Sequence, residues 1–260
     1  MKAVILAAGE GNRLKKYTKD LPKGMLEFAG KSLIERQIST LRAAGVEEII
    51  VVRGFAGDKI GFLDVTYRVN EAFATTNMVV SLFCAEDKMP GGVIVSYADI
   101  LYSAETITAL IGSPFDITVT VDTEWKRYWM MRYGRCDFDT ESLVLSGDRI
   151  VELGISDPPP SKIDARYVGL IKFSAKGVEQ MRSVWHKYRG AYWDKAWQVS
   201  GKPLRNAYLT DMLQALIDEG FPVHALKREN GWIEFDTNDD YEKALEWKKN
   251  GSLDAILRID

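Results

Sequence analysis

Short apolar strands alternate with helices over the first 122 residues, and this alternation most restricts the fold. Lys2–Ala7 is a continuous apolar run, typical of a strand buried on both faces. Ser32 and Glu35 have the spacing of a capping box, which predicts a helix over residues 32–44 that ends at Gly45. The same signals predict strands at Glu48–Arg53, 65–69, 92–95 and 116–121, and helices at 78–85 and 104–110. The fold class is therefore α/β, with a mostly parallel sheet that binds ligands at the carboxyl ends of its strands.

The pattern changes after Asp122. Residues 125–133 (WKRYWMMRY) are aromatic and basic, and residues 141–145 and 149–153 resemble paired strands. Further elements are predicted as strands at Arg166–Phe173 and 223–226 and helices at 175–188, 209–219 and 240–249. No repeat, low-complexity segment or linker divides the chain. We therefore expect one domain, residues 1–260, in which residues 123–260 shape a second pocket beside the half formed by residues 1–122.

Composition and charge exclude several classes of protein. The net charge of −3 argues against nonspecific binding to nucleic acid or to an anionic membrane. No apolar run approaches the roughly 18 residues that span a bilayer, and the N-terminus lacks the pattern of a signal peptide. Cys84 and Cys136 form neither a CxxC pair nor a metal cluster, as expected for free thiols in a cytoplasmic protein.

A glycine-rich loop follows the first strand. Gly9-Glu10-Gly11 leads into Arg13, Lys15 and Lys16. The loop lacks the GxxxxGK[ST] pattern of a P-loop, and Leu14 replaces the third glycine of a dinucleotide fingerprint. Taken alone, the segment is either a turn with a solvated basic rim or a place where phosphates bind.

The wider string is more specific. LAAGEGNRL is followed by LPKGML, and together they resemble the LxAGxGxRL and PKxxL signature of the sugar-phosphate nucleotidyltransferase family. The resemblance implies an enzyme in which a nucleoside triphosphate reacts with a phosphorylated small molecule and pyrophosphate leaves. It also implies a Rossmann-like nucleotidyltransferase fold: a mostly parallel mixed sheet flanked by helices, with a nucleotide-binding half at residues 1–122 and a smaller β-rich, acceptor-binding part at residues 123–260.

The chemistry of the triphosphate explains these residue types. Glycines let backbone N–H groups approach phosphate oxygens, Arg13 offers a fork of donors for the β- and γ-phosphates, and Lys23 reaches the α-phosphate. We therefore expect Arg13 and Lys23 to be catalytic, and Lys15 and Lys16 to be solvated neighbours. The other residues expected to bind the nucleotide are Leu6, Ala7, Ala8, Gly9, Glu10, Gly11, Thr76, Asn77 and Ser81.

Two carboxylates are candidates for binding a metal. Two negative reactants approach more easily when Mg²⁺ bridges them, and Mg²⁺ needs one or two carboxylates. Asp99 follows the strand predicted at residues 92–95, and Asp236 lies in the late stretch EFDTNDD. The resemblance implies a metal ligand at both positions. The alternative for Asp236 is that it helps to cap the final helix.

The segment FATTNMVVSL indicates a branch of the family. Its T-x-x-x-x-SL form is similar to that of phosphocholine and phosphonate cytidylyltransferases, including those acting on 2-aminoethylphosphonate. This resemblance favours CTP as the nucleotide. A sugar-1-phosphate nucleotidyltransferase using UTP, dTTP or GTP is the alternative enzyme. A catalytically silent nucleotide-binding module is disfavoured, because such a module would have lost Arg13, Lys23 or an acidic metal ligand.

Aromatic and acidic side chains in the second half suit an acceptor that carries an ammonium group. Most of these aromatics are expected to be core residues, with two or three lining the pocket. The candidates for contact with the acceptor are Asp122, Trp125, Tyr133, Glu141, Lys162, Tyr208, Asp211, Trp232 and Glu234. The identity of the acceptor and the oligomeric state stay open.

Overall fold

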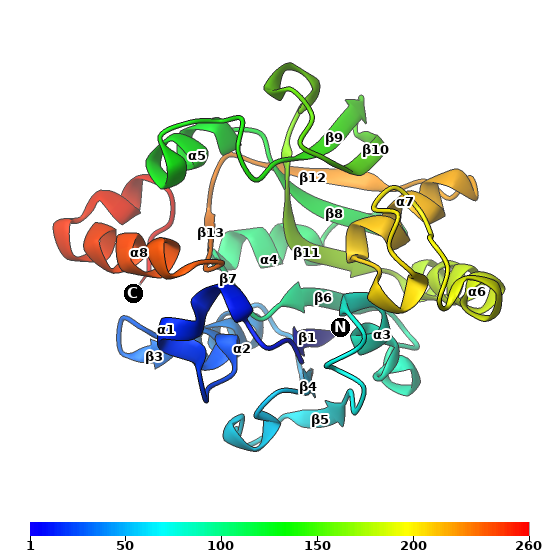
Figure 1. Cartoon of the computed structure of the whole chain (residues 1–260), viewed down its shortest axis with the longest axis horizontal. Helices are drawn as coiled ribbons and strands as arrows, with labels where there is room; N and C mark the ends of the chain where they lie inside the picture. The colour runs from blue at the N-terminus through cyan, green and yellow to red at the C-terminus, as the bar shows by residue number, and fades with distance from the viewer. Residues whose placement is uncertain (260) are drawn as a thin grey trace.

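The computed structural model describes residues 1–259 as a layered α/β fold (Figure 1). Its strands are β1 (Lys2–Ala7), β2 (Glu27–Phe28), β3 (Lys31–Ser32), β4 (Glu48–Arg53), β5 (Thr66–Val69), β6 (Val93–Tyr97), β7 (Ile100–Tyr102), β8 (Ile117–Asp122), β9 (Glu141–Ser146), β10 (Arg149–Ser156), β11 (Arg166–Phe173), β12 (His224–Arg228) and β13 (Trp232–Glu234). Its α-helices are α1 (Lys15–Thr18), α2 (Leu33–Ala43), α3 (Met78–Phe83), α4 (Ala104–Ile111), α5 (Trp125–Tyr133), α6 (Ala175–Tyr192), α7 (Leu209–Asp218) and α8 (Asn238–Asn250).

One mixed sheet runs through both halves of the chain. Its nine strands lie in the order β5-β4-β1-β6-β11-β8-β12-β10-β9, from the bottom to the top of Figure 1. The strands from β5 to β6 are parallel, β11 is antiparallel to both of its neighbours, and β12 is parallel to β8. The predicted α/β class and its largely parallel sheet are confirmed.

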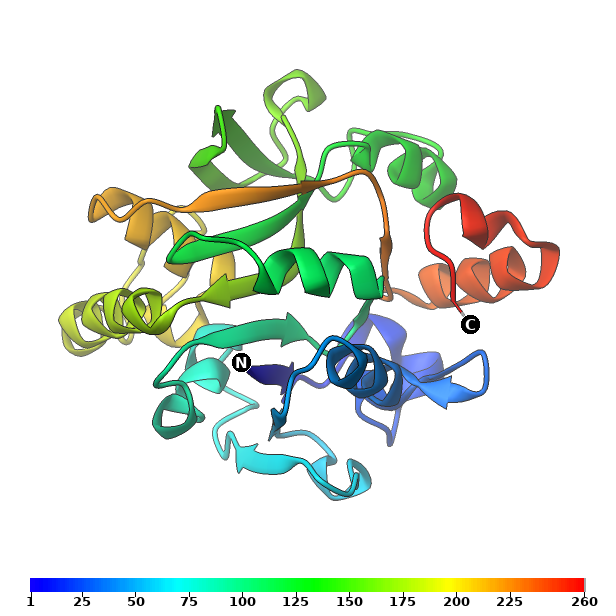
Figure 2. The same ribbon diagram turned by 180° about the vertical axis from the view of Figure 1, so that it is seen from behind.

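The sheet separates two hydrophobic cores. Ala3, Ile5 and Ala7 of β1 contribute to the core that includes α2 and α4, while Val4 and Leu6 contribute to the core that includes α3, α6 and α7. Successive side chains of a strand point to opposite faces, so a strand covered on both sides is apolar throughout. Figure 2 shows α4 lying across the central strands on one face, and Figure 1 shows α7 on the other.

A second, two-stranded ladder joins distant parts of the chain. β7 follows β6 directly and pairs with β13, with Leu101 opposite Ile233. Just beyond the ladder, the backbone N–H of Phe235 donates a 2.9 Å hydrogen bond to the carbonyl of Asp99. The ladder therefore brings Asp99 and Asp236 to one place, although 136 residues separate them in the sequence.

Several predicted boundaries change in the structure. The helix predicted at residues 175–188 continues to Tyr192, and the final helix begins at Asn238 rather than at residue 240. The aromatic and basic stretch after Asp122 folds as helix α5. Within residues 1–259, no helix is long and apolar enough to cross a membrane.

Candidate active site

A cavity of about 480 Å³ lies at the carboxyl ends of β1 and β6. Gly11 adopts φ +63°, a left-handed conformation that glycine adopts without strain, and so turns the loop back toward Lys23. The predicted nucleotide-binding residues that line this cavity are Leu6, Ala7, Ala8, Gly9, Gly11, Thr76, Asn77 and Ser81. Glu10 does not line it; its carboxylate accepts a hydrogen bond from Asn12 at 3.1 Å.

Asn70 positions two of the side chains that line the cavity, those of Thr76 and Ser81. It is buried, and its Nδ2 donates to the hydroxyl oxygens of Thr76 and Ser81 at 3.0 Å each. Because one amide orients two lining hydroxyls, the geometry of this part of the cavity wall is fixed before any ligand binds.

Lys23 joins the two predicted metal-binding carboxylates. Its Nζ lies 2.5 Å from Asp99 Oδ2 and 2.7 Å from Asp236 Oδ1, and all three residues line the cavity. Burial lowers the pKa of Lys23, but the two carboxylates outweigh burial and raise that pKa above its ordinary value. The lysine is therefore a fixed positive charge at the point where the two carboxylates converge.

Asp236 is surrounded by cations. Arg13 Nη2 lies 3.0 Å from its Oδ1, and Arg132 Nη2 lies 3.4 Å from its Oδ2. Burial raises the pKa of Asp236, but Lys23, Arg13 and Arg132 together hold it well below its usual range. The carboxylate of Asp236 is consequently ionised at any physiological pH.

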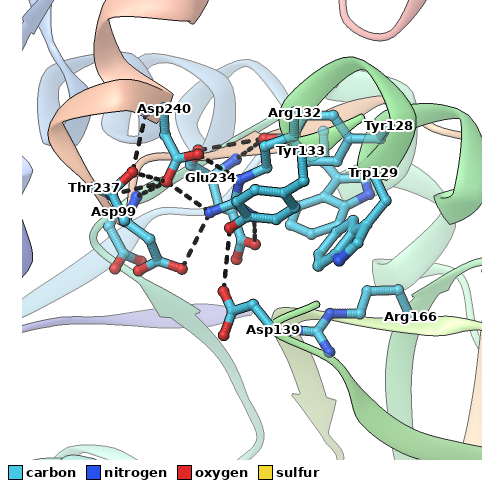
Figure 3. Close-up of polar contacts among 12 residues, drawn as sticks. Asp99, Tyr128, Trp129, Arg132, Tyr133, Asp139, Arg166, Glu234, Thr237 and Asp240 are labelled. Carbon is cyan, nitrogen blue, oxygen red and sulfur yellow. Dashed lines mark hydrogen bonds and ion pairs between the residues drawn. The ribbon is translucent and has the colours of Figure 1, made fainter. Parts of the chain in front are cut away.

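Arg132, which lies in helix α5, binds the late acidic segment, residues 234–240. Its guanidinium is buried and binds both oxygens of Asp240, at 2.7 and 2.8 Å, and also pairs with Glu234 (Figure 3). Asp240 in turn accepts hydrogen bonds from the backbone and hydroxyl of Thr237, at 2.8 Å each. Arg132 therefore ties helix α5 to the turn that carries Asp236. Sequence reasoning missed this role.

Four of the predicted acceptor contacts are buried parts of the scaffold. Asp122 accepts hydrogen bonds from the backbone of Asn230 and from Trp232 Nε1, each at 2.9 Å, and Trp125 is 1% exposed. Asp211 is fully buried, where it caps its own helix through Tyr208 N and binds Ser200. None of these four residues lines the cavity: Asp122, Asp211 and Trp232 bond to other parts of the chain through their polar groups, and Trp125 packs in the hydrophobic core.

The remaining predicted acceptor residues differ in position. Tyr208 lines the cavity, whereas Lys162 is exposed on a short 3-10 turn (Pro160–Lys162). Tyr133 donates to Asp139 at 3.1 Å, and Asp139 lies 3.9 Å from Arg13 at the cavity wall. Burial raises the pKa of Glu141 and that of Glu234, the latter to about 7, against the opposing effects of Arg166 and Arg132 respectively.

The cavity also contains residues that the sequence did not single out. These are Asn12, Gly24, Phe73, Met78, Tyr97 and Ala98. Gly24 and Met78 lie inside two motifs already described, LPKGML and TTNMVVSL. Their position next to predicted site residues in the sequence could have identified them as cavity residues. Tyr97 has a structural signal instead: a Cβ at Gly169 would stand 2.8 Å from its ring, so the neighbouring strand β11 carries glycine where the ring lies.

The donor set at Asp99 and Asp236 fits Mg²⁺. Their carboxylate oxygens meet at one cation position, held by the Lys23 ammonium, on the wall of a cavity large enough for phosphates. Among residues 1–259, no group of three or more His, Cys, Asp or Glu side chains is arranged to hold a metal ion. Two carboxylates without a complete protein cage are typical of Mg²⁺ sites that are completed by substrate phosphates and water.

The fold and this cavity together define a nucleotidyltransferase: a glycine-rich loop, a lysine and two convergent carboxylates at the strand ends of an α/β sheet. The chain belongs to the family of proteins with a MobA-like NTP transferase domain, whose model matches residues 3–151. This result confirms the nucleotidyltransferase resemblance.

Two relatives match along nearly their whole length. The CTP:phosphoglutamine cytidylyltransferase of Campylobacter jejuni is 34% identical over 257 residues, which cover 95% of this chain and 100% of the relative. The choline-phosphate cytidylyltransferase of Streptococcus pneumoniae is 26% identical, with coverage of 96% and 99%. A solved structure of CTP:phosphocholine cytidylyltransferase from S. pneumoniae superposes with a TM-score of 0.71 at 23% identity, covering 94% of this chain and 97% of that one. The superposition supports the fold.

Proposed function

We propose that this chain transfers a CMP group from CTP to a small phosphorylated or phosphonate acceptor and releases pyrophosphate, with Mg²⁺ as cofactor. The observation that carries the proposal is the convergence of Lys23, Asp99 and Asp236 on one point of a cavity whose other wall is the glycine-rich loop. The two relatives that match this chain from end to end are both named for cytidylyl transfer, which favours CTP over other nucleotides.

The first half of the chain binds the nucleotide in this proposal. Backbone N–H groups around Gly9 and Gly11 face the phosphates, and Arg13 neutralises the β- and γ-phosphates. Arg13 is exposed and pairs with Asp236 at 3.0 Å, and its exposed guanidinium can turn onto a bound triphosphate. Thr76, Asn77 and Ser81 also line the cavity, where they offer polar groups to the ribose or base.

Asp99 and Asp236 would hold Mg²⁺. When bound, the ion neutralises charge on the α-phosphate and on the attacking group. Lys23 stands between the same carboxylates, and its ammonium stabilises negative charge that develops at the α-phosphate.

The reaction needs no nucleophile from the protein. An oxygen of the acceptor phosphate or phosphonate attacks the α-phosphorus of CTP in line, a new P–O bond forms, and the bond to pyrophosphate breaks. The leaving group departs with its electron pair as pyrophosphate. Residues of the chain therefore act by positioning the reactants and by neutralising charge, which is the role that the cations around the cavity suit.

The second half binds the acceptor in this proposal. Tyr208 lines the cavity. Tyr133 bonds to Asp139, which lies 3.9 Å from the cavity residue Arg13. Glu141 is two residues from Asp139, and Glu234 is two residues from Asp236, which lines the cavity. Lys162 does not line the cavity and is exposed on its own short turn.

A screen of nucleotides against acceptors tests the function. Purified protein with MgCl₂ is incubated with CTP, UTP, dTTP or GTP and with phosphocholine, 2-aminoethylphosphonate, phosphoglutamine or glucose-1-phosphate, and pyrophosphate is measured. We expect release with CTP and at least one of the first three acceptors, abolished by EDTA and restored by MgCl₂. Release with UTP and glucose-1-phosphate alone would show a sugar nucleotidyltransferase instead.

A further inference from the structure

Beside the cavity, two oppositely charged side chains form a long ion pair with no hydrogen bond between them. Arg166 begins strand β11 and Glu141 begins strand β9. Arg166 Nη1 lies 3.9 Å from Glu141 Oε1, which is too long for a hydrogen bond. Within residues 1–259, the Nε and Nη1 atoms of Arg166 are buried and donate to no acceptor. A buried guanidinium with open donors is costly unless a ligand supplies the acceptors.

The aromatic ring of Trp129 holds the Arg166 guanidinium in place. The guanidinium carbon lies 4.7 Å from the ring centre, a cation–π distance, and the arginine side chain is 11% exposed. Trp129 is itself fully buried and donates a 2.9 Å hydrogen bond to the carbonyl of Phe138. The cation is therefore preorganised rather than free to close onto Glu141.

The pair stands next to the reacting end of the cavity. Strand β11 runs antiparallel to β6 with Leu170 opposite Ser96, so Arg166 lies beyond the carboxyl end of β6, where Asp99 follows. The next residue, Tyr167, makes an edge-to-face contact with Tyr97 of the cavity wall at 5.9 Å. In Figure 3 the guanidinium of Arg166 extends from β11 toward Asp139.

We propose that Arg166 and Glu141 bind an amino-acid head group of the acceptor, with the carboxylate on Arg166 and the ammonium on Glu141. The proposal rests on the proposed function and narrows its acceptor class. A zwitterion whose two charges stand on one carbon matches a cation and an anion 3.9 Å apart. An acceptor with only an ammonium group would leave the donors of Arg166 unpaired and would face its positive charge.

The reacting phosphate is a poorer partner for Arg166. That group belongs at Lys23, Asp99 and Asp236, where in-line attack on the nucleotide takes place. Glu141 stands beside Arg166, and a doubly charged phosphate there would be repelled by that carboxylate. A singly charged carboxylate with its own ammonium meets no such penalty.

Matched phosphonates test the head-group site by calorimetry. The pairs are 2-amino-3-phosphonopropionate against 2-aminoethylphosphonate, and 2-amino-5-phosphonopentanoate against 4-aminobutylphosphonate; the members of each pair differ only in the carboxylate. With MgCl₂ and α,β-methylene-CTP present, we expect the carboxylate-bearing member of at least one pair to bind about 10- to 100-fold more tightly. Arg166→Met should bring that ratio close to one.

Controls separate binding from folding. Arg127→Met removes an exposed arginine from helix α5 and should leave the ratio as in the wild type. Arg166→Lys keeps the charge but loses the planar fork, and should restore only part of the preference. The melting temperature checks that each variant folds. Glu141→Gln should weaken binding of the aminophosphonates but not of 3-phosphonopropionate, which has a carboxylate and no ammonium.

Two results would overturn the inference. One is wild-type protein that binds both members of every pair equally. The other is Arg166→Met protein that folds and loses affinity for both members to the same extent, which would place the reacting phosphate or phosphonate on Arg166. Failure of the proposed function has a different signature, the absence of pyrophosphate release from CTP with any acceptor, and the calorimetric ratio does not depend on turnover.

Discussion

At the scale of single residues, the cavity is organised by the pairing of a few cations with more numerous carboxylates. Lys23 is shared by Asp99 and Asp236, and Asp236 is also shared by Arg13 and Arg132. Each cation therefore affects several carboxylates, so that removing one changes the charge and position of its neighbours together.

Lys23→Met is predicted to lower kcat for pyrophosphate release by about 10²- to 10³-fold, because one stabilising charge at the α-phosphate is lost. Steady-state rates with saturating CTP and acceptor measure this effect. Lys15→Met is the matched control: Lys15 is exposed in the short helix after the loop, and its variant should keep wild-type rates. Full activity in folded Lys23→Met protein would rule out the role given to Lys23.

Asp236→Asn is predicted to change how stability depends on pH. Burial raises the pKa of Asp236, but Lys23, Arg13 and Arg132 hold it below the unfolded value of about 3.9. A depressed folded pKa stabilises the native state above the unfolded pKa, and this stabilisation is lost as pH falls through the folded pKa. Urea unfolding between pH 7 and pH 3 should therefore show a lower free energy of unfolding for Asp236→Asn at pH 7 and a shallower decline toward acid. Asp58→Asn, at an exposed site, should follow the wild type; identical slopes for all three proteins would contradict the prediction.

At the scale of elements, the late acidic segment is placed by a ladder and a helix cap. The pairing of β7 with β13 fixes the position of Asp236, which follows β13, relative to Asp99, which precedes β7. The start of helix α8 is then fixed by a capping box, in which Thr237 Oγ1 accepts from Asp240 N at 3.2 Å and Asp240 accepts from the Thr237 backbone at 2.8 Å.

Thr237→Ala is predicted to lower the free energy of unfolding by about 1 kcal/mol, because the helix loses its cap. The rate should also fall, since Thr237 adjoins Asp236 and bonds to Asp240, which Arg132 holds. Ser174→Ala removes the equivalent cap of helix α6, where Ser174 Oγ accepts from Gly177 N at 3.1 Å. Urea titration should show similar losses for both variants, and pyrophosphate assays should show a lower rate for Thr237→Ala alone. Equal rates in the two variants would show that the cap at Thr237 does not affect the active site.

At the scale of the whole molecule, one sheet takes strands both from residues 1–122 and from the chain beyond them. The cavity takes residues from the loop after β1, from β6 and its continuation, and from the segment after β13. Because β11 and β8 connect these parts through continuous hydrogen bonding, the two halves are expected to unfold together.

Calorimetric unfolding is predicted to show one transition that CTP with MgCl₂ moves to higher temperature. At a ligand concentration of about 100 Kd, the stabilisation is about 2.7 kcal/mol. The shift should be lost in Asp99→Asn with Asp236→Asn, and MgCl₂ alone serves as the control. Two transitions, of which CTP moves only one, would mean that residues 1–122 and 123–260 fold as separate units.

The fold was largely predictable because its strands are buried on both faces. Lys2–Ala7, Glu48–Arg53 and Arg166–Phe173 were predicted with the bounds that the structure gives, since an apolar run marks each strand from end to end. The strands β7 and β13 were not predicted. They have three residues each and pair across more than a hundred positions, so no local pattern reveals them.

Residues of the candidate site that belong to a sequence motif were predictable. A charged residue that only positions other side chains was not. Gly11, Lys23 and Asp99 stand in or just after recognisable strings and all line the cavity. Arg132 lies within an aromatic, basic stretch, and such a stretch does not reveal that the arginine is buried against Asp240. Asp122 and Trp232 were predicted to line the pocket because a carboxylate and an aromatic ring suit an ammonium group. Only the structure shows that the two side chains bond to each other.

The position of Lys23 between Asp99 and Asp236 has a consequence for the order in which charges change. Without substrate, the protein supplies its own counterion to the two carboxylates. In the proposed function, Asp99 and Asp236 would exchange the Lys23 ammonium for Mg²⁺, and the ammonium would then pair with the triphosphate. This exchange would couple binding of the metal to the placement of Lys23 on the nucleotide, so that each would favour the other.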